Sequence, residues 1–309
     1  MKKLVAIGGG TGLSVLLSGL KDYFDVTAVV TVGDNGGGSG ILRADLNMLP
    51  PGDIRNCLLA LSEAPEELKK LLSHRFSSGA LNGQSLGNLM IAGMSESLGS
   101  FEDGVGFLSS VLNIKGEVYP VSSNLMNLVA DLSNGDRIYG ESEIAIFSLK
   151  RKARILDIFL NEPCTLSLGA KKAILSSETI TLGPGSLYTS VICNLLVDEM
   201  RELLKNKKII YVANVMTQPE ETYNYSLKDH VSEIERYLDR PIDFIFANVE
   251  KPSAQLEERY RLEGSIAVIP TEDEITFFGD RLIMGAFLDE KLGYIRSDAK
   301  RIAQKISEL

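Results

Sequence analysis

The stretch LVAIGGGTGLSVLLSGL, residues 4–20, decides the fold class of this chain. Its first four residues are aliphatic and glycine follows at once, a pattern typical of a strand buried on both faces of a parallel sheet. Leucines then recur at the spacing that lines one face of a helix, at Leu13, Leu16, Leu17 and Leu20. A second apolar run at residues 26–32 predicts the next strand, so the chain opens with a β-α-β unit, whose crossover is right-handed in nearly all known cases.

The rest of the chain continues this alternation with one interruption. Amphipathic runs predict that residues 43–115 are mainly helical, and short segments that end at a glycine or an asparagine predict strands at 179–182, 209–213 and 244–247. Between them, Asn134 and Gly135 are a strong hairpin signal inside an antiparallel insertion at residues 116–165. We therefore predict one α/β domain over residues 1–309, a Rossmann-like doubly wound parallel sheet with an antiparallel β-hairpin insertion. Its core covers residues 1–115 and 166–250, and residues 251–309 complete the site.

Composition excludes several classes of protein. The 309 residues are 44% hydrophobic, which supports a sizeable core, and the net charge of −9 disfavours a nucleic-acid partner. The three cysteines, Cys57, Cys164 and Cys193, are far apart and odd in number, which points to a reducing compartment. With only His74 and His230, we expect no zinc site. No apolar run is long enough for a signal peptide or a membrane span, so we expect a cytoplasmic protein without membrane insertion.

The glycine cluster between the first strand and the first helix is the first candidate site. Glycines there let the backbone approach a phosphate, and the helix N-terminus offers N–H groups and a positive dipole end. The cluster is not a dinucleotide fingerprint, because Leu13 stands at the third glycine position, and no Walker lysine follows. The alternative is a purely structural tight turn. The predicted ligand-binding residues here are Gly9, Gly10, Thr11 and Gly12.

Two polar clusters follow along the chain. Residues 33–40 contain five glycines, so this loop is either mobile or shaped around a ligand, to which Asp34 and Asn35 would bind. Asp34 stands where doubly wound enzymes place a ribose-binding acid. In the next cluster, Asp53 is a natural cap for its own helix, whereas Arg55 and Asn56 are predicted to face the cleft, with Arg55 as an anion clamp.

The sequence GQSLG, residues 83–87, matches the G-x-S-x-G pattern of a serine hydrolase. In such hydrolases the serine stands on a sharp strand-to-helix turn, the nucleophile elbow, which needs a strand before the serine. Here a loop-like segment precedes Ser85, and His230 is the only downstream histidine that could serve as the base. We therefore expect Ser85 to cap a helix and Asn88 to face the ligand.

A second strand, glycine turn and helix N-terminus lies near the middle of the chain. Gly183, Gly185 and Ser186 follow the strand at 179–182 and open a helix to about residue 204, where a second anionic group can bind. The next strand is followed by amide and hydroxyl groups suited to sugar or base edges, those of Asn214, Thr217 and Gln218. A plain turn is the alternative for both segments.

These clusters, in this order, resemble the YvcK proteins, the gluconeogenesis factors of bacteria. The similarity spans nearly the whole chain and is specific. It rests on residues 8–14, 51–56, 85–89, 182–190 and 214–219. The YvcK proteins are in turn similar to CofD, the 2-phospho-L-lactate transferase of deazaflavin coenzyme synthesis, which uses magnesium. The resemblance implies a Rossmann-like, CofD-like fold and a cytoplasmic protein needed for cell shape and wall synthesis on gluconeogenic carbon sources. It also implies binding of UDP-sugars such as UDP-N-acetylglucosamine.

Three positions depart from the family pattern. Asn35 stands where many relatives have a second Asp, which weakens a two-carboxylate magnesium site. Gln84 replaces the histidine usual before Ser-Leu-Gly-Asn, and Glu220 replaces the glycine after Thr-Gln-Pro. These departures weaken the hypothesis of a transferase that uses these positions in catalysis.

The end of the chain supplies two further candidates. The apolar stripe of Ile302, Ile306 and Leu309 predicts a terminal helix capped by Ser297 or Asp298. Arg296 then lies beside a helix N-terminus, where a cation is disfavoured unless an anion is shared. Its segment resembles the Arg-His-Asp segment of relatives, and Tyr260 is a candidate to stack on a base or to bond the diphosphate. Alternatively, Arg296 pairs with a surface carboxylate and Tyr260 packs on its own helix.

Two classes of function remain, with a nicotinamide enzyme as a weaker third. A binding regulator needs only the glycine turns and helix N-termini that hold the phosphates. A transferase also needs a metal or a base beside a pocket for the acceptor. Asp34 and Asp53 are the candidate catalytic groups of the transferase, with magnesium as its cofactor; otherwise we expect no cofactor and no metal. We favour the regulator, with a UDP-sugar or a related phosphorylated nucleotide as ligand. A homodimer and a cell-wall or morphogenesis protein partner are compatible with it.

Overall fold

A computed structural model describes residues 1–151, 153–290 and 293–309 of the chain. Its centre is a seven-stranded sheet of order β10-β9-β8-β7-β1-β2-β3, in which every neighbouring pair is parallel. This confirms the predicted α/β fold with a parallel sheet. The strands are β1 (Lys3–Gly8), β2 (Asp25–Val30), β3 (Glu117–Pro120), β7 (Thr179–Leu182), β8 (Lys208–Val212), β9 (Phe244–Asn248) and β10 (Leu282–Gly285).

The strand order places a topological switch point between β1 and β7. From β1 the chain winds through β2 to β3 at one edge, and from β7 it winds through β8 and β9 to β10 at the other. Ile7 of β1 pairs with Leu182 of β7, and the Gly183 N–H donates to the Ile7 carbonyl at 3.1 Å. The glycine turns that follow these two strands therefore begin side by side.

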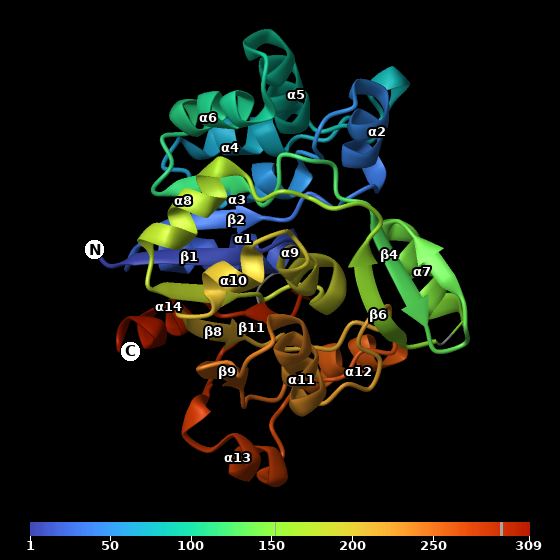
Figure 1. Ribbon diagram of the computed structural model, residues 1–309, viewed down its shortest axis with the longest axis vertical. Coiled ribbons are helices and arrows are strands. Elements are labelled where there is room, and N and C mark those ends of the chain that lie inside the picture. The colour runs from blue at the N-terminus through green and yellow to red at the C-terminus, as the bar shows by residue number, and fades with distance from the viewer. Residues whose placement is uncertain (152, 291–292) are drawn as a thin grey trace.

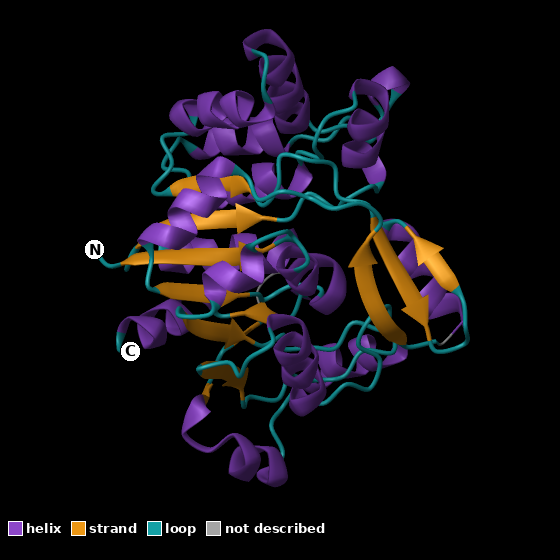
Figure 2. Cartoon of the chain, in the orientation of Figure 1, coloured by secondary structure: helices purple, strands orange, loops and turns teal. Residues whose placement is uncertain are grey.

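Helices cover both faces of the sheet, as Figures 1 and 2 show. Alternate residues of β1 belong to two separate cores, Leu4 and Ala6 to one and Val5 and Ile7 to the other, which explains the uninterrupted apolar run. One face carries α1 (Gly10–Leu20), α3 (Gly52–Leu61) and α14 (Ala299–Ser307). The other face carries α8 (Leu168–Ser176), η2 (Leu187–Ile192), α9 (Cys193–Leu195), α10 (Met200–Leu204) and α11 (Leu227–Leu238).

Residues 43–115 are mainly helical, as predicted. They include the end of α2 (Gly37–Leu46), α4 (Glu66–Ser73), η1 (Gly79–Leu81), α5 (Leu86–Leu98) and α6 (Phe101–Val111). Near the other end of the chain lie α12 (Ala254–Leu262), α13 (Glu272–Phe278), η3 (Gly279–Arg281) and the short antiparallel pair β11 (Leu288–Asp289) and β12 (Arg296–Ser297). In the described part of the chain, every helix is too short or too polar to span a lipid bilayer.

The insertion is an antiparallel sheet of β4 (Leu128–Leu132), β5 (Arg137–Tyr139) and β6 (Ile155–Leu160), with α7 (Glu141–Arg151) packed on it. The hairpin at Asn134 and Gly135 is confirmed, and Gly135 takes a positive φ of 89° in its turn. This sheet stands beyond the carboxyl ends of the parallel strands, toward which their arrows point in Figure 2.

Two predicted boundaries were wrong. The insertion is narrower than residues 116–165, because β3 pairs in parallel with β2 and completes the main sheet. The helix expected from residue 186 to about 204 is interrupted: η2 is a π-helical turn, and Glu199 adopts a φ of 65° just before α10. The predicted terminal helix is confirmed as α14, whose N-cap Asp298 accepts from the Arg301 N–H at 3.1 Å.

Candidate functional site

A cavity of about 220 Å³ lies at the switch point, where the turns after β1, β7 and β8 meet the segment before α14. In open α/β sheets this edge is where ligands bind. Ten of the residues singled out from the sequence line it together: Gly10, Thr11, Gly12, Gly185, Ser186, Asn214, Thr217, Gln218, Tyr260 and Arg296. Gly9 and Gly183 are buried beneath them.

The first two turns pack directly on one another, and glycine is what allows it. A Cβ added at Gly12 would lie 2.4 Å from the Pro184 carbonyl oxygen, and one at Gly9 would lie 2.4 Å from a Thr31 methyl. A Cβ at Gly10 would make only an ordinary contact with Ser190 Oγ, at 3.7 Å, but the φ of Gly10 is +63°. Gly12 is thus required by close backbone approach and Gly10 by backbone conformation.

Asp53 closes the first turn. The structure corrects the expectation that it caps its own helix, because the N-cap of α3 is Pro51. Instead, the Gly10 N–H at the N-terminus of α1 donates to Asp53 Oδ2 at 2.6 Å. Burial raises the pKa of Asp53 to about 6, with nearby Asp34 acting in the same direction and the Gly10 hydrogen bond opposing it. Asp53 is therefore the resident anion at a helix end predicted to receive a phosphate.

Glu221 closes the second turn, and sequence analysis missed it. Its carboxylate accepts the Tyr188 N–H at 2.8 Å, the Thr189 N–H at 3.4 Å and the Thr189 hydroxyl at 2.5 Å. Glu221 is only 6% exposed, and this burial raises its pKa against the opposing effect of the three hydrogen bonds. No local motif marks Glu221, because its partners lie more than 30 residues away.

The backbone N–H groups that remain available to a ligand at the switch point belong to α1. Gly10 donates to Asp53, but Thr11 and Gly12, the next two residues of the helix, have N–H groups without a partner within a helix.

The amides after β8 hold the second turn in place. Asn214 accepts the Gly185 N–H at 3.0 Å and donates to the Gly185 carbonyl at 2.8 Å. Gln218 donates to Ser186 Oγ at 2.9 Å, and Thr217 Oγ1 accepts the Ile266 N–H at 2.9 Å. In this structure these side chains shape the cavity wall rather than project freely into it.

Tyr260 and Arg296 form the side of the cavity contributed by the end of the chain. The Tyr260 hydroxyl accepts the Ile295 N–H at 3.2 Å, which ties α12 to the strand that carries Arg296. Arg296 is exposed, and its guanidinium lies 5.6 Å from the centre of the Tyr294 ring. The segment thus brings a cation to the cavity edge.

Four predicted residues form a separate buried network outside the cavity lining. Arg55, only 8% exposed, donates to Ser85 Oγ, to Asn88 Oδ1 at 2.9 Å and to Asn56 Oδ1 at 2.8 Å. Burial lowers the pKa of this guanidinium. The structure therefore does not place Arg55 as an anion clamp in the cavity.

Ser85 caps α5, as predicted, by accepting the Asn88 N–H at 3.3 Å. The 3-10 turn η1 and a loop precede it instead of a strand, so the hydrolase elbow is absent at this position.

The glycine-rich loop is fastened to the insertion. Asn35 donates to Glu143 Oε2 at 2.8 Å and accepts the Ser142 N–H at 2.9 Å, while Asp34 accepts the Gly36 N–H at 2.8 Å. Burial, Asp34 and Asp53 raise the pKa of nearby Glu141.

These carboxylates do not form a metal centre. Across residues 1–151, 153–290 and 293–309, no group of three or more His, Cys, Asp or Glu side chains is placed to hold a metal ion. Asn35 uses both ends of its amide within the protein. The residues present therefore do not fit a magnesium ion held by the protein alone.

Together the sheet and the cavity define a Rossmann-like protein whose candidate ligand site lies at the switch point, between two facing glycine turns. Residues 4–287 match the sequence model of the family described as 2-phospho-L-lactate transferase CofD. The chain belongs to this CofD family.

Curated relatives carry a different name. The "Gluconeogenesis factor" of Bacillus subtilis is 38% identical over 99% of this chain and 97% of its own length. A Thermotoga maritima protein provisionally named a gluconeogenesis factor is 48% identical over 85% of this chain and 84% of its own. The crystal structure of a UPF0052 family member from Bacillus halodurans matches with a TM-score of 0.94 at 39% identity, covering 99% of both chains.

Proposed function

We propose that the protein is a cytoplasmic regulator that binds a UDP-sugar such as UDP-N-acetylglucosamine without consuming it. The observation that carries the proposal is the meeting of two glycine turns with Tyr260 and Arg296 around one cavity. The names of the relatives support a role in growth on gluconeogenic carbon sources, and the YvcK resemblance supports a role in cell shape.

The chemistry of the cavity suits a diphosphate diester. Thr11 and Gly12 offer N–H groups at the positive end of α1, and Arg296 offers a guanidinium from the segment before α14. Asp53 and Glu221 already neutralise part of each helix end, which favours a phosphate with one charge over a terminal phosphate with two. At about 220 Å³ the cavity is smaller than a typical pocket for a whole ligand, so one ring of the nucleotide-sugar would extend over Tyr260.

Calorimetry with UDP-N-acetylglucosamine, followed by product analysis, tests this proposal. Arg296→Ala should weaken binding by about 1.5–3 kcal/mol, the range for a charged hydrogen bond. Arg261→Ala is the matched control, because this exposed arginine pairs with Glu258 on α12. Consumption of the sugar nucleotide, or equal affinity of both variants, would contradict the proposal.

A phosphorus-group transferase of the kind named by the family description is the second candidate. It is favoured by Asp53, whose pKa of about 6 suits a general base beside the first turn. Product formation from a phospholactyl guanylyl donor and a deazaflavin acceptor, lost in Asp53→Asn, would establish it. Binding of the UDP-sugar without any transfer would support the regulator instead.

A further inference from the structure

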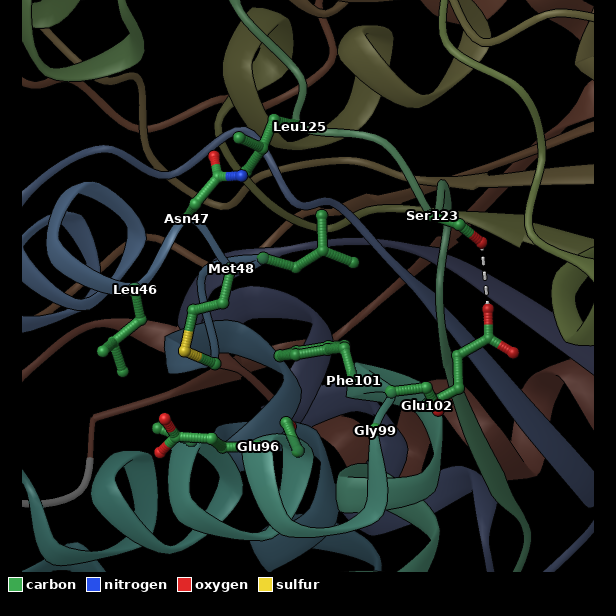
Figure 3. A pocket seen from close by; sticks show the side chains of 13 residues that line it. Leu46, Asn47, Met48, Glu96, Gly99, Phe101, Glu102, Ser123 and Leu125 are labelled. Carbon is green, nitrogen blue, oxygen red and sulfur yellow. Dashed lines mark hydrogen bonds between the residues drawn. The ribbon is translucent and has the colours of Figure 1, made fainter.

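A second cavity, of about 520 Å³, lies apart from the switch point. It is bounded by the end of α2 and residues 47–49, the last turns of α5, the start of α6 and the loop between β3 and β4 (Figure 3). It shares no lining residue with the first cavity. Its volume lies within the 300–1,000 Å³ that is usual for ligand pockets.

The walls of this cavity combine apolar side chains with serines, an asparagine and two glutamates. Figure 3 shows Met48 and Phe101 pointing toward one another from opposite sides, with Leu46 and Leu125 nearby. Leu46 remains 47% exposed, although it is a large apolar side chain. The fold thus leaves an apolar surface open to a ligand of matching shape.

The charges at this cavity all have one sign. Glu96 and Glu102 are the charged side chains among the described residues that line it, and no Lys, Arg or His accompanies them. Glu102 accepts the Ser123 hydroxyl at 3.1 Å, which fixes its position on one side. The C-terminal ends of α2 and α5 also meet here, at Asn47 and Gly99, and bring the negative ends of two helix dipoles, whereas the N-terminus of α6, capped by Ser100, brings one positive end.

We propose that this cavity binds a small organic monocation, an ammonium group on a compact apolar body. The apolar body packs between Met48 and Phe101, and the face of the Phe101 ring also attracts a cation. The ammonium group lies toward Glu96, because Glu102 already accepts the Ser123 hydroxyl and no basic side chain of the lining neutralises Glu96. The same charges repel a nucleotide, so this ligand differs in class from the one proposed for the switch point.

Three probes of similar size separate the charge effect from the apolar effect: 2-phenylethylammonium, neutral 2-phenylethanol and anionic 3-phenylpropionate. Binding is followed by NMR of protein labelled with ¹³C in its methionine methyl groups, and Met48→Leu assigns the resonance of interest. The ammonium should shift the Met48 resonance saturably at millimolar concentrations or below. The alcohol should bind several-fold more weakly, and the carboxylate should leave the resonance unchanged.

Glu96→Gln tests the source of the selectivity. Glu96 is exposed, so the variant should fold like the parent while its affinity for the ammonium falls roughly fivefold, the size of a partly solvated cation contact. Glu67→Gln, an exposed glutamate of α4 outside the cavity, should bind like the parent. Equal binding of ammonium and alcohol, equal behaviour of the two variants, or no saturable shift of Met48 would each overturn the proposal.

Discussion

The two strand–turn–helix units beside the switch point have the same order of elements. In each, a carboxylate from a distant part of the sequence accepts hydrogen bonds from the helix N-terminus, but the two carboxylates differ in the number of these bonds and in burial. In the β1–α1 unit, Asp53 makes one hydrogen bond, to the Gly10 N–H, and has a pKa near neutrality. In the β7–η2 unit, Glu221 makes three hydrogen bonds and is almost fully buried. The comparison indicates that the second unit is fixed by folding, whereas the first is the side on which a ligand phosphate competes with the protein's own anion.

The largest effect is expected where the two units touch. Gly12→Val should destabilise the fold by about 3 kcal/mol, the upper end for overpacking, because its Cβ would meet the Pro184 carbonyl. UDP-sugar binding should be lost with it. Gly106→Ala, at a helix position with open space, should instead stabilise the fold by up to about 1 kcal/mol. Urea denaturation and calorimetry measure both, and a stable Gly12→Val that binds ligand would show that the turns can move apart.

Glu221→Gln tests whether the second unit is the fixed one. The loss of charged hydrogen bonds to the start of η2 should cost about 1.5–3 kcal/mol in urea denaturation. Its neighbour Glu220, whose carboxylate lies outside these three bonds, is the matched control as Glu220→Gln. If the two variants had equal stability, the proposed difference between the units would fail.

Ser85 provides an uncharged cap for reference. Ser85→Ala should cost about 0.5–2 kcal/mol, because it removes the N-cap of α5. Ser73→Ala, an exposed serine of α4, should stay within about 0.5 kcal/mol of the parent. Covalent labelling of Ser85 by a fluorophosphonate would show a nucleophile and not a cap.

Asp53→Asn should have the smallest effect on stability and the clearest effect on pH dependence. Because its folded pKa of about 6 lies above the usual value for Asp, the contribution of Asp53 to stability increases as the pH falls through about 6. A neutral Asp53 also repels a phosphate less, so affinity for the UDP-sugar should increase over the same range. Asp53→Asn should bind the UDP-sugar at pH 7 with the affinity that the parent has at low pH, and its affinity should not change with pH over this range. Asp280→Asn, an exposed residue of η3, should keep the parent profile, and an unchanged profile in Asp53→Asn would exclude the competition.

The features that were predicted correctly from the sequence are those that a local pattern of residues determines. A continuous apolar run identified β1, a short strand signal before a glycine-rich turn identified β7, and glycine placement identified both turns, so most of the cavity lining was found. The roles of Asp53 and Glu221 depend on partners 43 and 32 or more residues away, and such pairing has no local signature. Arg55 was misjudged for the same reason, since the side chains that bury it come from α5. The short strand β3 was assigned to the insertion because the spacing of its side chains does not reveal a parallel partner.

The packing of α14 on α1 has a consequence for biosynthesis. A Cβ at Gly19 of α1 would lie 2.3 Å from the Ala299 carbonyl oxygen, so the first helix and the last one described are close partners. Arg296 lies three residues before this contact. A ribosome therefore has to synthesise the chain through α14 before the side of the cavity formed by Tyr260 and Arg296 is held in place. Shorter nascent chains that carry both glycine turns would still lack this side of the cavity.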